Sequence, residues 1–241
     1  IIGVSSGASA GAAFAILFLS GTMFTVTASA FVGSVLAVIL ALGLSAIAPG
    51  KSNSTMVLSG LAVHSLAQTL LMILKLSADP ERELAAIEYW IMGSLNGITM
   101  QKIPFTFAIS IVCIAILFVL YRQVLLLSME EEEARMLGVP VQKVRMCILI
   151  FATLIVAAIV SATGIISFVG LLAPHAAKLL TKDSRVSTLW LSGILGSILL
   201  CLADILARSV AINELPVSIF TSIIGAPFLI YLMMRKGEIH E

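Results

Sequence analysis

The sequence predicts an all-α fold, a polytopic transmembrane helical bundle. Of its 241 residues, 60% are hydrophobic and only 11% are charged, whereas roughly a quarter of an ordinary soluble domain is charged. Residues 1–50 contain no Asp, Glu, Lys or Arg, and an uncharged run of that length does not suit a water-facing surface. A soluble enzyme is therefore excluded. The net charge of +1 gives no reason to expect nucleic acid as a partner.

Run lengths predict where the chain crosses the bilayer, because a helix needs about 20 apolar residues to span about 30 Å of hydrocarbon. Residues 1–50 are too long for one helix, and the small polar residues at 20–22 divide them into a short first span and a second span at 24–47. Single spans follow at 55–74 and 104–121, each bounded by Lys or Arg at both ends.

The uncharged run 146–177 would form a helix of about 48 Å, which is either one tilted span or a hairpin of two. A hairpin folded near Gly164 places ten of the fourteen Lys and Arg residues on one side, whereas a single crossing divides them six against eight. Because Lys and Arg favour the cytoplasmic side, we expect the hairpin, with Gly164, Gly170 and Pro174 as its breaks and a short returning span.

Two further spans, at 186–207 and 216–234, bring the expected total to eight crossings with both ends in the cytoplasm. Ile1 is not a start methionine and the chain opens inside an apolar helix, so we expect a longer parent protein. All of 1–241 is then one N-terminally truncated membrane domain.

Two water-facing segments stand out. Residues 128–145 read SMEEEEARMLGVPVQKVR: acids in the first turns complement a helix dipole, and Gly138 before Pro140 ends the helix. Its apolar side favours a docking helix for a cytoplasmic partner over a solvated connector. On the outer side, residues 77–101 are too polar to cross but contain Tyr89 and Trp90, which suit a helix at the membrane interface.

Other candidate sites leave alternatives open. Gly3, Ser5 and Gly7 match the G-x-S-x-G nucleophile pattern, although such small residues more often permit close helix packing. The histidines and cysteines show no metal-ligand spacing, so we expect no metal site. Asp204 and Arg208, four apart on one helix, are either a structural ion pair or a functional site. His64, in mid-span, faces a polar cavity or packs as a neutral side chain.

Six ordered matches along the whole chain carry a resemblance to a known family. They are GVSSGASAG at 3–11, YWIMGSL at 89–95, EEEARMLGVPV at 131–141, GIISFVGLLAPHAAKLL at 164–180, ADILAR at 203–208 and ELPVSIFTSIIGAPFLIYLM at 214–233. The chain resembles the permease subunits of ABC importers for iron siderophores, haem and cobalamin. Those subunits have ten helices, so the resemblance implies that two N-terminal helices are absent from this sequence.

The resemblance also implies partners and site residues. A second permease subunit, identical or different, two cytoplasmic ATPases that use ATP and Mg, and an extracytoplasmic binding protein would complete the importer, and this chain would bind no cofactor and catalyse no reaction itself. The family's coupling helix, which contacts the ATPase, corresponds to Glu131, Glu132, Ala134, Leu137 and Gly138, with Glu130 where many members have Gly. Arg208 corresponds to an outward arginine that docks the binding protein. The pathway and its gate correspond to Ser54, Thr55, Leu58, Leu61 and His64.

The expected function is therefore import of an iron(III)-siderophore or a similar iron or cobalt chelate across a bacterial or archaeal cytoplasmic membrane, with the siderophore chosen as the most frequent cargo in the family. Two other functions compete. An ion-coupled carrier needs a carboxylate in mid-membrane, and Asp204 lies near the outer end of its span beside an arginine. An intramembrane hydrolase built on Ser5 needs a histidine within about 3 Å of its hydroxyl.

Overall fold

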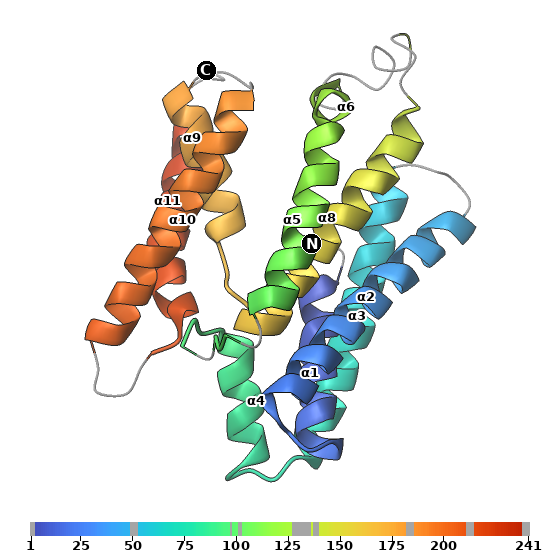
Figure 1. Cartoon of the computed structure of the whole chain (residues 1–241), viewed down its shortest axis with the longest axis vertical. Helices are drawn as coiled ribbons and strands as arrows, with labels where there is room; N and C mark the ends of the chain where they lie inside the picture. The colour runs from blue at the N-terminus through green and yellow to red at the C-terminus, as the bar shows by residue number, and fades with distance from the viewer. Residues whose placement is uncertain are drawn as a thin grey trace. The chain divides into compact units, whose positions relative to one another are not determined.

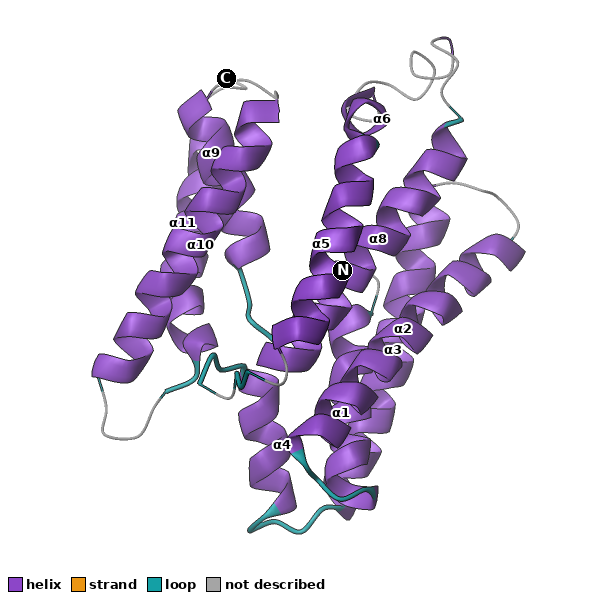
Figure 2. Cartoon of the chain, viewed as in Figure 1, coloured by secondary structure: helices purple, strands orange, loops and turns teal. Residues whose placement is uncertain are grey.

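The computed structural model describes residues 3–48, 53–96, 98–100, 103–126, 136, 140–181, 186–210 and 215–237. Within these ranges the secondary structure consists of helices joined by loops and turns (Figure 2). Contacts divide the chain into two compact units, one formed by residues 1–91 with 97–164 and the other by residues 92–96 with 165–241. The all-α prediction is confirmed.

The first unit begins with α1 (Val4–Phe18), α2 (Met23–Ile47) and α3 (Asn53–Ser77), which pack side by side (Figure 1). The predicted break at 20–22 is confirmed: α1 ends at Phe18, and the Thr22 hydroxyl accepts the Thr25 N–H to cap the start of α2. The unit continues with α4 (Glu83–Met92), α5 (Ile103–Val119), α6 (Tyr121–Leu126) and α8 (Val141–Thr163).

Glycines bring α1 and α2 into backbone contact. A Cβ atom added to Gly33 would overlap the Gly7 carbonyl oxygen, and one added to Gly11 would overlap the Ser29 carbonyl oxygen. Across the same interface the Ser34 hydroxyl donates to the Val4 carbonyl at 3.2 Å. Small residues at such positions let membrane helices approach closely, because in lipid the association rests on packing and interhelical hydrogen bonds.

The short helix α4 packs against the C-terminal half of α3. Ile87 packs into an apolar cluster with Ala13, Leu71 and Leu74, and Lys75 Nζ lies 2.8 Å from Glu88 Oε1. In the turn that precedes α4, the Glu83 carboxylate accepts the Asp79 N–H at 2.9 Å. A helix within the segment 77–101 is thus present, and its place at the membrane interface stays a prediction.

The apolar run 146–177 is not one helix. Helix α8 begins at Val141, five residues earlier than the expected span and inside the segment 128–145, and it ends at Gly164 with φ 74°. The next helix, α9 (Val169–Thr181), belongs to the second unit together with α10 (Val186–Ser209) and α11 (Val217–Gly237). In that unit Ala203, Ala207 and Val217 form the buried contact between α10 and α11.

Helix length bears on the number of crossings. Among the described residues, four helices are long and apolar enough to cross a membrane, at Met23–Ile47, Ser54–Ser77, Val141–Thr163 and Ser187–Ser209. Val4–Phe18, Ile103–Val119 and Val217–Leu232 are shorter apolar helices. The 13 residues of α9 extend about 20 Å, less than the hydrocarbon core. The chain is therefore a multi-pass membrane protein, and the count of eight crossings stays a prediction.

Gly33→Ala should destabilise the protein, because the added methyl group meets the backbone of α1 rather than a movable side chain. Overpacking of this kind costs about 1 to 3 kcal/mol, more than the gain in helix propensity. Gly43→Ala is the matched control on the same helix, since a Cβ there meets nothing within 4 Å. Melting temperatures in detergent should fall for Gly33→Ala only, and equal values for the two variants would contradict the close contact.

Candidate functional site

Helix α3 has two different faces. Ser59, Val63, Leu71 and Leu74 are 3 to 8% exposed and pack against the rest of the first unit. The opposite face is open and carries, at intervals of three or four residues, Ser54, Leu58, Leu61, Ser65 and Thr69. Residues at this spacing lie on one side of a helix. The open face therefore runs along most of the length of α3.

The structure brings most of the predicted pathway residues onto that open face. Leu58 and Leu61 are 64% and 59% exposed, and Ser54 is exposed with them. Thr55 is half-buried, and its carbonyl accepts the Ser59 hydroxyl. His64 is exposed beside the leucines on the flank of the face. Its backbone nitrogen lies close to Gly3, where an added Cβ would come within 3.3 Å.

The open face also contains polar residues that the sequence analysis missed. Ser65 and Thr69 are exposed and Gln68 is half-buried, and the Thr69 hydroxyl donates back to the Ser65 carbonyl at 2.9 Å. The spacing of three to four residues from Leu58 and Leu61 was the signal that could have found them. Polar side chains in a membrane helix avoid lipid and face a protein or a water-filled cavity. This face is thus suited to line a path.

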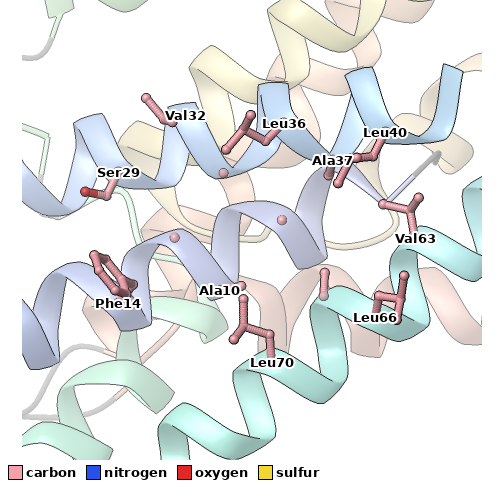
Figure 3. A pocket seen from close by; sticks show the side chains of 14 residues that line it. Ala10, Phe14, Ser29, Val32, Leu36, Ala37, Leu40, Val63, Leu66 and Leu70 are labelled. Atoms are coloured by element: carbon pink, nitrogen blue, oxygen red, sulfur yellow. The ribbon is translucent and has the colours of Figure 1, made fainter. Parts of the chain in front are cut away.

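An apolar groove of about 470 Å³ lies on a different side of α3, over α1 and between α2 and α3 (Figure 3). Gly7, Gly11 and Gly33 line it where α1 and α2 meet, and Leu66 and Leu70 line it on α3. Ser54, Leu58, Leu61 and His64 are not among its lining residues. The groove and the open face of α3 are therefore separate surfaces.

Arg208 and Asp204, which the sequence places four residues apart on one helix, form an ion pair. Arg208 Nε donates to Asp204 Oδ2 at 2.9 Å, with the arginine side chain 49% exposed and the carboxylate 24% exposed. Ala203 and Ala207 are buried on a different side of α10. Arg208 therefore lies on the exposed side of this helix. Because the pair uses Nε, the two terminal amino groups of the guanidinium stay available for a second carboxylate.

The coupling-helix residues Glu131, Glu132, Ala134, Leu137 and Gly138 lie outside the described residues. The helices on either side of that segment are described. Helix α6 precedes it and contacts α8, which follows it. The two described helices that flank this segment therefore lie next to each other. Between them, Met136 is helical and 82% exposed.

The geometry does not support the competing functions. The Ser5 hydroxyl makes no hydrogen bond to His64 or His175, the two histidines within the described part of the chain. Asp204 is the one carboxylate in the described candidate spans, and its charge is paired with Arg208. Among the residues described, no three His, Cys, Asp or Glu side chains gather as metal ligands.

The fold is that of a multi-pass membrane protein with an open face on α3. Comparison with known proteins identifies its family. The profile of the FecCD transport family matches residues 1–235. The chain belongs to the FecCD transport family.

Characterised relatives cover several cargoes. The chain is 35% identical to the cobalamin import system permease protein BtuC of Halobacterium salinarum over 98% of its own length and 63% of that protein. It is 34% identical to the molybdate import system permease protein MolB of Haemophilus influenzae over 98% of its length and 71% of that protein. It is also 34% identical to the iron(3+)-hydroxamate import system permease protein FhuG of Bacillus subtilis over 98% of its own length and 73% of that protein. The chain thus spans about two thirds of the length of these relatives.

A solved structure agrees with the fold. An ABC transporter of the metal-chelate type, in an inward-facing conformation, superposes with a TM-score of 0.90 at 31% identity, over 97% of this chain and 74% of that chain.

Cysteine labelling tests whether the open face of α3 meets water. Leu61→Cys and Ser65→Cys should react with a membrane-impermeant thiol reagent, because we expect their face to line an aqueous path. Leu66→Cys is the matched control, since Leu66 is 67% exposed but lines the apolar groove. The three native cysteines are first replaced by serine. Equal labelling of Leu66→Cys and Leu61→Cys would remove the distinction between the two surfaces.

Proposed function

We propose that this chain is the permease subunit of an ATP-driven importer, which moves an iron(III)-siderophore or a similar large iron or cobalt chelate across the cytoplasmic membrane by alternating access. The observation that carries the proposal is the open face of α3, where Ser54, Leu58, Leu61, Ser65 and Thr69 mix hydroxyl and apolar groups along one side of a membrane helix. A face that packs only against lipid has no need of the hydroxyls.

The composition of this face favours a chelate over a bare oxyanion. From Ser54 to Ile73, α3 contains no Lys or Arg, so a molybdate dianion would meet no compensating side-chain charge along it. A chelate presents organic groups around its metal, and leucine side chains with interspersed hydroxyls match such a surface. Two of the named relatives are import permeases for cobalamin and for iron(3+)-hydroxamate, which supports a cargo of this class.

Energy would come from partner subunits. We place ATP and Mg in two separate cytoplasmic ATPases and assign no cofactor and no catalytic role to this chain. A second permease subunit, identical or different, would complete the membrane core. Relatives from bacteria and from Halobacterium support a bacterial or archaeal cytoplasmic membrane as the location.

Coupling to the ATPase would run through Glu131, Glu132, Ala134, Leu137 and Gly138. The contact between α6 and α8 supports this assignment, because the two described helices that flank residues 127–139 lie next to each other. Closure of the ATPases could then act on α5 and α8 together, since these helices also contact each other. Coupling energies between sites are typically about 1 to 3 kcal/mol.

Leu137→Asp tests the importer assignment. The charged side chain should remove apolar contact with the ATPase and reduce the stimulation of ATP hydrolysis by cargo-loaded binding protein by about 5-fold to 150-fold. The assay uses the full-length permease reconstituted in vesicles with its ATPase and binding protein. Leu137→Met, which keeps the apolar volume, should retain stimulation. Full stimulation in Leu137→Asp would refute coupling through this segment.

Arg208→Glu tests docking of the binding protein. We expect weaker binding, because the change places a negative charge opposite an acidic group, and losing one partner of a desolvated pair costs about 2 to 5 kcal/mol. A glutamate-to-arginine change on the binding protein should restore part of the affinity. Asp204→Asn is the control, since it breaks the intrahelical pair but leaves the Arg208 charge in place. Unchanged affinity in Arg208→Glu, with melting lowered as in Asp204→Asn, would assign the arginine to the fold alone.

A further inference from the structure

The chain adopts a strained turn where it enters α9. Phe168 has φ 68° and is the one non-glycine residue with positive φ among those described. The Val169 N–H donates to the Ser167 carbonyl at 2.9 Å, which closes a three-residue turn around Phe168. A γ-turn with positive φ at its central residue is rare and strained, and a bulky side chain in this region is an outlier. Glycine would adopt the same turn without strain.

The Phe168 ring is held against a glycine on α11. A Cβ atom built on Gly225 would lie 2.6 Å from Phe168 Cγ and 2.7 Å from its Cβ, so the ring fits only because Gly225 has no side chain. Pro227 follows two residues later inside α11 and cannot donate a backbone hydrogen bond to Ile223. At the place where the Phe168 ring packs, α11 therefore has a gap left by the missing side chain of Gly225 and lacks one backbone hydrogen bond.

A second contact fixes the residues just before the turn. The Ser218 hydroxyl, near the start of α11, donates to the Ile165 carbonyl at 2.7 Å. Gly93 packs on the same carbonyl with φ 71°, where a Cβ atom would overlap it, and the Gly93 carbonyl accepts the Val217 N–H at 3.2 Å. Three segments that are distant in sequence therefore meet around residues 165–168.

The position of this turn suggests what it does. The chain passes from one compact unit to the other at residues 164–165, immediately before the turn. A strained backbone persists only where its surroundings enforce it, and such strain gathers at switch regions. Here the contact that holds the turn is the Phe168 side chain against Gly225. Because a single side chain makes this contact, one movement of the ring would break it.

We propose that Phe168 and Gly225 form a conformational latch: the ring in the Gly225 notch holds the strained turn, and its release lets the start of α9 relax during the transport cycle. The timing of release rests on the proposed function. The latch itself does not, because it is a property of the resting protein. Thr221 lies one turn before Gly225 on the side of α11 that faces Phe168, and it is fully buried. A cysteine at this position therefore reports opening of that side of α11.

The experiment labels Thr221→Cys with a maleimide in purified full-length protein whose native cysteines are replaced by serine. In the resting state, without nucleotide or cargo, adding Phe168→Ala or Gly225→Ala should speed labelling roughly tenfold, because local opening is no longer opposed by the latch. Gly170→Ala is the matched control, since a Cβ on that α9 residue meets nothing within 4 Å. Labelling of Phe168→Ala and Gly225→Ala at the rate of Gly170→Ala would overturn the proposal.

Melting separates strain from lost packing. Phe168→Gly and Phe168→Ala both remove the ring, but only alanine keeps the strained φ. Phe168→Gly should therefore melt at a higher temperature than Phe168→Ala, and the reverse order would overturn the strained turn.

Labelling during ATP-driven transport tests whether the Phe168 ring leaves Gly225 in the transport cycle. With ATPase, loaded binding protein and ATP, labelling of Thr221→Cys should rise above the resting rate. Cargo transport without any such rise would overturn release as a step of the cycle. If no transport occurs, the proposed function fails, and the resting-state comparison still decides whether the latch exists.

Discussion

Backbone contact between α1 and α2 determines where the rest of the first unit lies. Gly7, Gly11 and Gly33 leave no space for a Cβ atom between these helices, and the Ser34 hydroxyl adds a hydrogen bond across the contact. Helix α1 is fixed in this way and in turn positions α3, through Gly3 beside His64 at one end and Ala13 beside Leu71 and Leu74 at the other. The buried side of α3 is thereby set, and the opposite face is left open.

The size of a side chain, rather than its polarity, decides whether it is buried or exposed in this protein. The buried residues are mostly alanine, glycine, serine and valine, and Ser34, Ser161 and Thr221 are fully buried with their hydroxyls bonded to backbone carbonyls. Most of the large apolar residues, among them Phe24, Ile47 and Leu76, are exposed, and Leu71, Leu74 and Ile87 are among the few that are buried. Lipid solvates such side chains as well as a protein interior does, so helix association in a membrane depends on close packing of small residues.

Much of the fold followed from run lengths and residue types, because span length and charge placement are local properties of the chain. The breaks at 20–22 and at Gly164 are confirmed, whereas the breaks expected at Gly170 and Pro174 are wrong, because both residues lie inside α9. The four-residue spacing of Asp204 and Arg208 left an ion pair open, and the structure shows that pair. The family resemblance indicated Leu58 and Leu61 on the open face of α3, whereas Ser65 and Thr69 on the same face were not predicted. The strained turn at Phe168 could not be predicted, because it depends on a glycine 57 residues later in the chain, a contact that only the tertiary structure brings about.

Uptake into sealed vesicles tests the central claim, that this chain is the membrane path of an ATP-driven chelate importer, most directly. The full-length permease would be reconstituted with its ATPase and binding protein, and a radiolabelled iron(III)-siderophore would be supplied on the binding-protein side with ATP on the other. The account predicts accumulation that stops without ATP and is insensitive to collapse of ion gradients. Accumulation that continues without ATP and follows an ion gradient, or ATP hydrolysis without entry of any metal chelate, would contradict it.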